Sequence, residues 1–147
     1  MSAYKHILLA TDLSEHSGQI AKKALSIAQE CNAQISIIHV IEHSPLAYGG
    51  EFSIPIDINL EQTIESNAKE MLNDFAQKYH IPEDHIHISM ESVKLAVTSY
   101  AEKIHADLIV VGTHGHHGLD FLLGSRANAI LHHAKCDVLA VRTHDKS

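Results

Sequence analysis

The chain has 147 residues, of which 45% are hydrophobic and 20% are charged, as is usual for a globular domain. This length predicts one domain, 1–147, that can bury a hydrophobic core and fold without stabilisation by disulfides or a metal. The formal net charge of −7, with no basic cluster longer than Lys22–Lys23, argues against a nucleic-acid partner.

No apolar run is long enough to cross a bilayer, and the first residues lack both the long apolar core and the cleavage site of a signal peptide. The two cysteines, Cys31 and Cys136, form no spaced motif. We therefore expect reduced, core-facing thiols in a cytoplasmic protein that has no membrane partner.

Apolar runs of strand length alternate with segments of helical period along the chain. The runs 5–11, 33–42 and 107–112 are almost continuously apolar, which is typical of strands buried on both faces. In chain order the sequence predicts a strand at 5–11, a helix with an apolar stripe from Ile20 to Cys31, a strand at 33–42, a loop at 43–58, a helix at 60–79, a strand at 85–90, a helix at 92–106, a strand at 107–112, a helix at 126–134 and a strand at 137–142.

Local patterns refine these elements. Asp12 or Ser14 is placed to cap the first helix. The helix 60–79 puts Met71 on its apolar face together with Leu72. The segment 85–90 alternates His and Ile, as an edge strand does.

Alternation of strand and helix predicts an α/β fold: a single-domain, open five-stranded parallel sheet with helices on both faces, in three layers of the Rossmann type. In such sheets ligands bind beyond the carboxyl ends of the strands, where the strand order reverses. Two segments compete for that position, 10–14 after the first strand and 112–125 after the fourth. They line one crevice if those two strands are neighbours.

The segment GTHGHHGLDFLLGS, 112–125, contains four of the seven glycines of the chain. Gly112 and Gly115 allow the backbone to come close to a ribose and to phosphates. The segment ends in Gly124 and Ser125, where the predicted helix begins, and a helix start offers unpaired N–H groups to an anion. Ser125 is placed to cap this helix or to bind the anion, whereas Gly118 is better explained by the shape of the loop.

Familiar catalytic and phosphate-binding motifs are absent from the sequence. No lysine follows Gly124 and Ser125 as a P-loop requires, and no G-x-G-x-x-G follows the first strand. Arg126 could stabilise phosphate charge, but no general base is evident to activate water. We therefore expect a binding or regulatory protein rather than an enzyme, and any hydrolysis should be slow.

The fourteen histidines raise the question of a metal. His114, His116 and His117 are close in sequence, but no cysteine pair accompanies them, and adjacent histidines diverge on a helix. We predict no metal site and interpret these side chains as solvated loop histidines. A separate hypothesis is that the histidines tune charge or dimer stability between about pH 5 and 7.

Together these segments resemble the universal stress protein family, specifically its A branch, over essentially the whole chain. The similarity lies in YKHILLATDLS, IIHV, DLIVVGTHG and LLGSRANAILHHAKCDVLAVR. ATP-binding members of that family carry G-x₂-G-x₉-G-[ST] after the fourth strand. This sequence has the first two glycines, Gly112 and Gly115, and the final Gly124 and Ser125, but its spacer, His116 to Leu123, is eight residues rather than nine.

The resemblance implies an adenine-nucleotide α-hydrolase-like fold and an ATP site, with Mg²⁺ accompanying the nucleotide. Asp12 would hydrogen-bond the nucleotide, although a helix cap or a turn carboxylate remains the alternative for this residue. The remaining residues would contact the adenosine or bind the phosphates. The adenosine contacts would be Ala10, Thr11, Val40, Val111 and Gly112, and the phosphate binders Gly115, Gly124, Ser125 and Arg126.

The resemblance also implies a cytoplasmic homodimer that pairs through its C-terminal strand. An edge covered by the tail of the chain itself is the alternative. The implied function is regulation or protection in starvation, growth arrest, oxidative stress and DNA damage, with ATP bound and not rapidly turned over. The alternative is a nucleotide-free dimeric stress protein that acts through protein partners, which the sequence does not identify.

Overall fold

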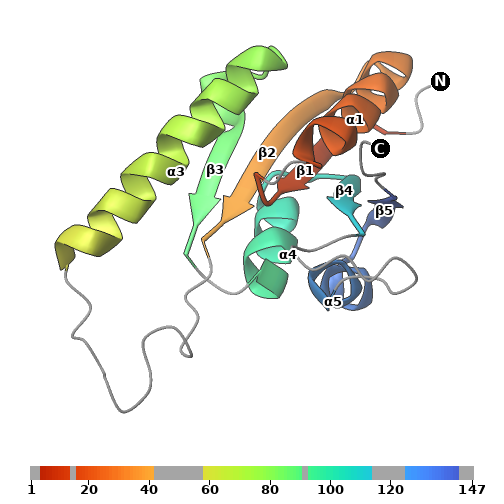
Figure 1. Ribbon diagram of the computed structural model, residues 1–147. Coiled ribbons are helices and arrows are strands. Elements are labelled where there is room, and N and C mark those ends of the chain that lie inside the picture. Colours follow the sequence, from red (N-terminus) through yellow and green to blue (C-terminus); the bar gives the residue numbers. More distant parts are fainter. Residues whose placement is uncertain (1–3, 14–15, 42–57, 91–92, 114–124, 143–147) are drawn as a thin grey trace.

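The computed structural model describes residues 4–13, 16–41, 58–90, 93–113 and 125–142 (Figure 1). Within these ranges strands and helices alternate as predicted. The strands are β1 (His6–Thr11), β2 (Gln34–Val40), β3 (Ile86–Ser89), β4 (Leu108–Gly112) and β5 (Asp137–Val141). The helices are α1 (Ser17–Cys31), α3 (Ile58–Lys78), the 3-10 turn η1 (Glu83–His85), α4 (Val93–Lys103) and α5 (Ser125–His133).

The five strands form one sheet in the order β3-β2-β1-β4-β5, and every pair is parallel. The chain moves from β1 outward to β2 and β3, then returns to β4 on the other side of β1. The strand order therefore reverses between β1 and β4. The predicted neighbours are confirmed, as are the positions of 85–90 and of the last strand at the two edges.

Helices cover both faces of the sheet, and each face has its own core. On one face α1 and α3 pack on the first core cluster, which includes Ile7, Leu9, Ile20, Ile37, Leu72 and Val110. On the other face α4 and α5 pack on the second core cluster, which includes Leu8, Ile38, Val97, Ile109, Val111 and Ile130. The predicted three-layer fold is thus confirmed.

Three of the helices end in the same way, without glycine. Asn32, His80 and His105 each adopt a left-handed conformation with φ between 54° and 59°. The next residue then donates its N–H to a carbonyl five residues back, for example Ala33 to Ala28 at 2.8 Å. This bond satisfies carbonyls at the helix end and turns the chain toward the sheet.

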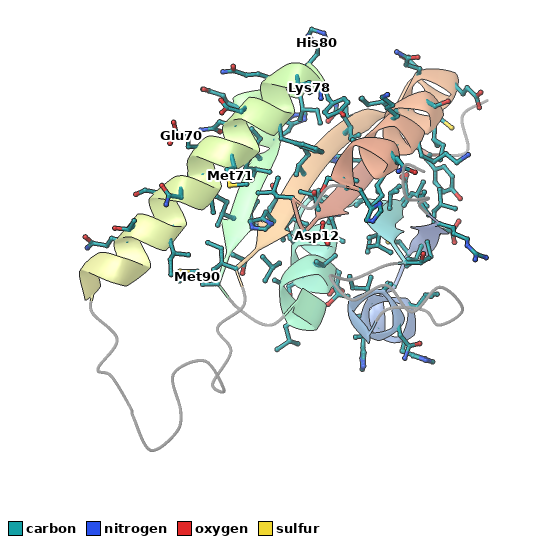
Figure 2. All side chains as sticks on the ribbon, in the orientation of Figure 1. Asp12, Glu70, Met71, Lys78, His80 and Met90 are labelled. Atoms are coloured by element: carbon teal, nitrogen blue, oxygen red, sulfur yellow. The ribbon has the colours of Figure 1, made fainter. Side chains whose placement is uncertain are left out.

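Two details of the helices differ from the prediction. Met71 is 53% exposed, because it lies at the border of the apolar stripe while Leu72, at 0%, occupies its centre (Figure 2). The residue that precedes the first turn of α1 is His16, which makes no side-chain cap. Asp12 is therefore not the cap of α1, and Ser14 and most of the predicted loop 43–58 lie outside the described residues.

A cluster of polar groups holds the amino end of the sheet. Nδ1–H of His6 donates to the carbonyl of Ile104 at 3.1 Å, so its Nε2 accepts the hydroxyl proton of Ser36 at 2.7 Å when the ring is neutral. The carboxylate of Asp107 accepts from the backbone N–H groups of Lys5 and His6. Burial is the main cause that lowers the pKa of His6, and the nearby His85 lowers it further. The hydrogen bond to the carbonyl of Ile104 and the charge of Asp107 act in the opposite direction and raise this pKa.

Gly112 permits α1 to lie close to β4. A Cβ atom at this position would overlap Cδ1 of Ile20, which is only 6% exposed. No described glycine has a positive φ, so space rather than backbone conformation requires glycine here. Gly112 therefore contributes to helix–sheet packing whatever else the loop does.

Both cysteines are free thiols, and Cys136 packs against the second core cluster as expected. Among the described residues, no helix has the length and apolarity to span a bilayer.

We predict that His6 makes stability fall with acid. The folded state holds a proton at His6 less readily than the unfolded chain, whose pKa is near 6.5, so stability is complete above this pH and is lost as pH falls through the lower folded-state pKa. Urea unfolding at about pH 7.5 and about pH 5.5 should show a larger loss of unfolding free energy in the wild type than in His6→Gln. Equal losses would contradict this assignment.

We predict that Gly112→Ala lowers the free energy of unfolding by about 1–3 kcal/mol, because the new methyl group overpacks against Ile20. Ile20→Val removes the overlapping Cδ1 atom and should restore part of this loss in the double variant. Chemical denaturation of the two single variants and the double variant measures the coupling. Additive losses would mean that the two side chains do not meet.

Candidate functional site

The ends of β1 and β4 meet at the centre of the carboxyl edge of the sheet. Leu9 is paired with Val110. Thr11 and Gly112, the last residues of β1 and β4, follow two residues later and therefore lie side by side. This is the point at which the strand order reverses, where α/β sheets bind their ligands. The structure thus brings together the two segments, 10–14 and 112–125, that the sequence singled out, as far as they are described.

A tight turn follows β1. Leu13 adopts a left-handed conformation with φ 58°, which is unfavourable for a leucine. Its N–H donates to Oγ1 of Thr11 at 3.1 Å, and its side chain packs against the first core cluster. These two contacts hold the turn, and Asp12 lies in it between Thr11 and Leu13, at the end of β1 (Figure 2).

Asp12 is half-buried and is tied to the start of α1. The hydroxyl of Ser17 donates to Oδ1 of Asp12 at 3.3 Å, and Ser17 in turn accepts the hydroxyl proton of Thr11 at 3.1 Å. Thr11 and Ser17 are 8% and 3% exposed, so water has little access to these bonds. Of the two alternatives to nucleotide binding, the structure thus excludes the helix cap and retains the turn carboxylate.

The neighbouring strand fixes the same turn from the other side. Nδ1–H of His39 donates to the carbonyl of Thr11 at 2.9 Å, and the two residues are partners in the β1–β2 register. The last peptide of β1 is therefore held by a side chain of β2.

The apolar residues of the predicted site lie beside this turn. Ala10 and Val40 are half-buried and pack at the border of the second core cluster. Val111 is 4% exposed and its side chain belongs to that cluster, so only its backbone is left to contact a ligand at this edge of the sheet. Thr113 continues β4 by donating its N–H to the carbonyl of Val141 at 3.0 Å.

The phosphate-binding part of the prediction is described only at its end. Gly115 and Gly124 lie outside the described residues. Ser125 is the first residue of α5 and Arg126 the second, so both belong to the turn of the helix whose N–H groups have no partner within the helix. The helix start that the sequence predicted is confirmed at this position.

Sequence reasoning missed Ser17 and His39. Ser17 stands on the apolar stripe of α1, three and four residues before Ile20 and Ala21. A small polar residue on a buried stripe, one turn after a strand–turn junction, was the available signal. His39 gave no comparable signal, since histidine in an apolar strand is compatible with many partners.

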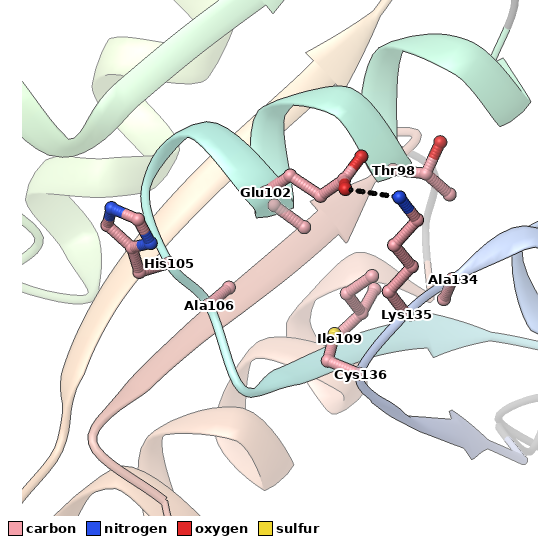
Figure 3. A pocket seen from close by; sticks show the side chains of 9 residues that line it. Thr98, Glu102, His105, Ala106, Ile109, Ala134, Lys135 and Cys136 are labelled. Carbon is pink, nitrogen blue, oxygen red and sulfur yellow. Dashed lines mark ion pairs between the residues drawn. The ribbon is translucent and has the colours of Figure 1, made fainter.

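A hollow lies at the opposite end of the sheet, before β4 and β5 (Figure 3). Its volume is about 400 Å³, and the ion pair between Glu102 and Lys135, 2.9 Å long, crosses it. Burial, helped by Asp137 and Asp107, raises the pKa of the Cys136 thiol in its wall. That thiol is a weak nucleophile at neutral pH, and no predicted site residue lies there.

The described residues contain no group of three His, Cys, Asp or Glu side chains that could hold a metal ion. The three loop histidines, His114, His116 and His117, lie outside those residues. His132 and His133 are exposed in the last turn of α5.

Comparison with known proteins agrees with the fold. The model of the universal stress protein family matches residues 3–142. Universal stress protein A homolog 1 of Coxiella burnetii is 59% identical over 138 residues, which cover 94% of this chain and 96% of that protein. Universal stress protein A homolog 2 of the same organism is 38% identical over 143 residues, 97% of each chain.

Solved structures show the same architecture. Universal stress protein UspA from Lactobacillus plantarum superposes with a TM-score of 0.78 at 25% identity, covering 97% of this chain and all of that one. A universal stress protein solved in complex with cAMP gives a TM-score of 0.63 at 27% identity, with the same coverage. The chain belongs to the universal stress protein family, as its motifs predicted.

Proposed function

We propose that this chain is a single universal stress protein domain, 1–147, that binds ATP and Mg²⁺ in the crevice between β1 and β4. One observation carries the proposal: a braced turn places Asp12 at the point where the strand order reverses, beside the end of β4. A carboxylate fixed at this place can accept hydrogen bonds from an adenosine.

The surroundings of Asp12 fit an adenine nucleotide. The half-buried side chains of Ala10 and Val40 offer apolar contact to a base, and the backbone of Thr11, Val111 and Gly112 lies at the neighbouring ends of β1 and β4. The start of α5, with Ser125 and Arg126, supplies N–H groups and positive charge suited to phosphates. Gly115 and Gly124 would complete the cradle, and Mg²⁺ would enter with the phosphates.

Two further points support a binding role. A universal stress protein with the same fold was solved in complex with cAMP, an adenine nucleotide. The sequence has no lysine at the phosphate loop and no evident base to activate water, so we propose binding without rapid hydrolysis. In this role the protein would regulate or protect in the cytoplasm during starvation, growth arrest, oxidative stress or DNA damage.

We predict saturable binding of ATP with Mg²⁺ by isothermal titration calorimetry, with micromolar affinity. Asp12→Ala removes the fixed carboxylate and Gly115→Val fills the proposed cradle, so both should abolish or strongly weaken binding. Asp84→Ala removes an exposed carboxylate from η1, at the other end of the sheet, and serves as the charge-matched control. It should bind as the wild type does.

Absence of wild-type binding up to millimolar ATP would contradict the proposal. The eight-residue spacer would then have closed the cradle, and the alternative function, a nucleotide-free dimer that acts through protein partners, would replace it.

We also propose a homodimer that pairs through β5. This strand is an edge of the sheet, and its residues Val138, Leu139 and Ala140 remain only half-buried. An apolar sheet edge is a template for pairing with a second strand.

Light scattering should therefore give twice the chain mass of 16.2 kDa. Hydrogen exchange at the amides of 137–141 should become faster on dilution, as the dimer dissociates. A mass of one chain, with exchange independent of concentration, would favour an edge covered by the tail of the chain itself.

A further inference from the structure

Three hydrogen bonds around Asp12 form a chain with a single direction. The N–H of Leu13 donates to Oγ1 of Thr11, the hydroxyl of Thr11 donates to Oγ of Ser17, and the hydroxyl of Ser17 donates to Oδ1 of Asp12. Each hydroxyl therefore accepts one bond and commits its only proton to the next group. The chain ends on the carboxylate that the proposed function requires.

Burial leaves this chain few alternatives. Ser17 is 3% exposed and Thr11 is 8% exposed, so solvent cannot easily replace either bond. Bonds in a buried chain also polarise one another, which strengthens the last donor toward an ionised acceptor. Because the hydroxyl of Thr11 already donates to Oγ of Ser17, the hydroxyl of Ser17 donates to Asp12 and not back to Thr11.

The same chain constrains the backbone. Leu13 holds a left-handed conformation that costs a leucine free energy, and its N–H is one end of the chain. His39 fixes the carbonyl of Thr11 from β2. The peptide on either side of Asp12 is thus held, and Ser17 is the contact that holds its side chain from α1.

We propose that Ser17 is a positioning residue for nucleotide binding, which orients the Asp12 carboxylate and stabilises its ionised form. This inference rests on the proposed function and adds to it a residue that does not itself touch the ligand. Ser17 acts before the ligand arrives, so that ATP meets a carboxylate already in place and binding loses less conformational entropy.

The first test is titration of Ser17→Ala with ATP and Mg²⁺ by calorimetry. We expect about tenfold weaker binding than in the wild type, as for the loss of one hydrogen bond to a charged group. The 3.3 Å length of the bond places the effect at the lower end of that range. Ser26→Ala removes an exposed hydroxyl from the same helix and should bind normally.

The second test separates positioning from a general loss of stability. Ile81→Val removes a methyl group from a buried side chain near the amino end of the sheet, so it should lower the melting temperature without changing ATP affinity. Ser17→Ala should also move the acid limit of ATP binding to higher pH, because the carboxylate has lost a donor to its charged form. Ile81→Val should leave that limit unchanged.

A double-mutant cycle tests whether Ser17 acts through Asp12. In an Asp12→Asn background, which removes the charge but keeps the shape, Ser17→Ala should weaken ATP binding by less than twofold. An equal effect of Ser17→Ala in both backgrounds would overturn the inference, as would wild-type affinity in Ser17→Ala itself. Either result leaves the proposed function standing, whereas a wild type that binds no ATP removes both.

Discussion

The pairing of β1 with β4 is the constraint on which the rest of the structure depends. β1 is the middle strand of five, and Ile7, Leu8 and Leu9 are wholly buried because helices cover both of its faces. β4 can join it only after the chain has crossed back from β3, and that crossing makes the strand order reverse. The same event therefore completes the core and brings the carboxyl ends of β1 and β4 together, so a change that weakens the pairing of β1 with β4 disturbs stability and the candidate site together.

Much of this could be predicted from the sequence. Near-continuous apolar runs such as 107–112 identify buried parallel strands, and the regular alternation with helices leaves few topologies. The details that depend on partners could not be predicted. Asp12 has the sequence features of a helix cap, but α1 begins only at Ser17, whose hydroxyl donates to Oδ1 of Asp12. Residues distant from it in sequence, such as His39, hold the turn that carries Asp12 and leave no periodic signal.

The histidines illustrate the same limit. Sequence reasoning interpreted them as solvated loop residues or as groups that tune the charge of the protein with pH. Several of the described histidines instead have defined structural roles. His80 and His105 end helices in a left-handed conformation, which His adopts more readily than most residues. His6, His39 and His85 each donate Nδ1–H to a backbone carbonyl of another segment. Their number thus reflects, in part, repeated use of one side chain as a donor that ties strands and helix ends together.

The end of β1 and the end of β4 differ in how strongly each supports the proposed nucleotide site. Gly112 opens the glycine motif at the end of β4, yet the close approach of Ile20 gives it a packing role that persists without any ligand. Asp12 has no comparable role in the core, and a leucine in an unfavourable conformation, two buried hydroxyls and a histidine all hold the turn that carries it. A left-handed leucine costs free energy, and strain of this kind is often found where a ligand binds. The braced turn after β1 therefore supports the proposed nucleotide site more directly than Gly112, the last residue of β4, does.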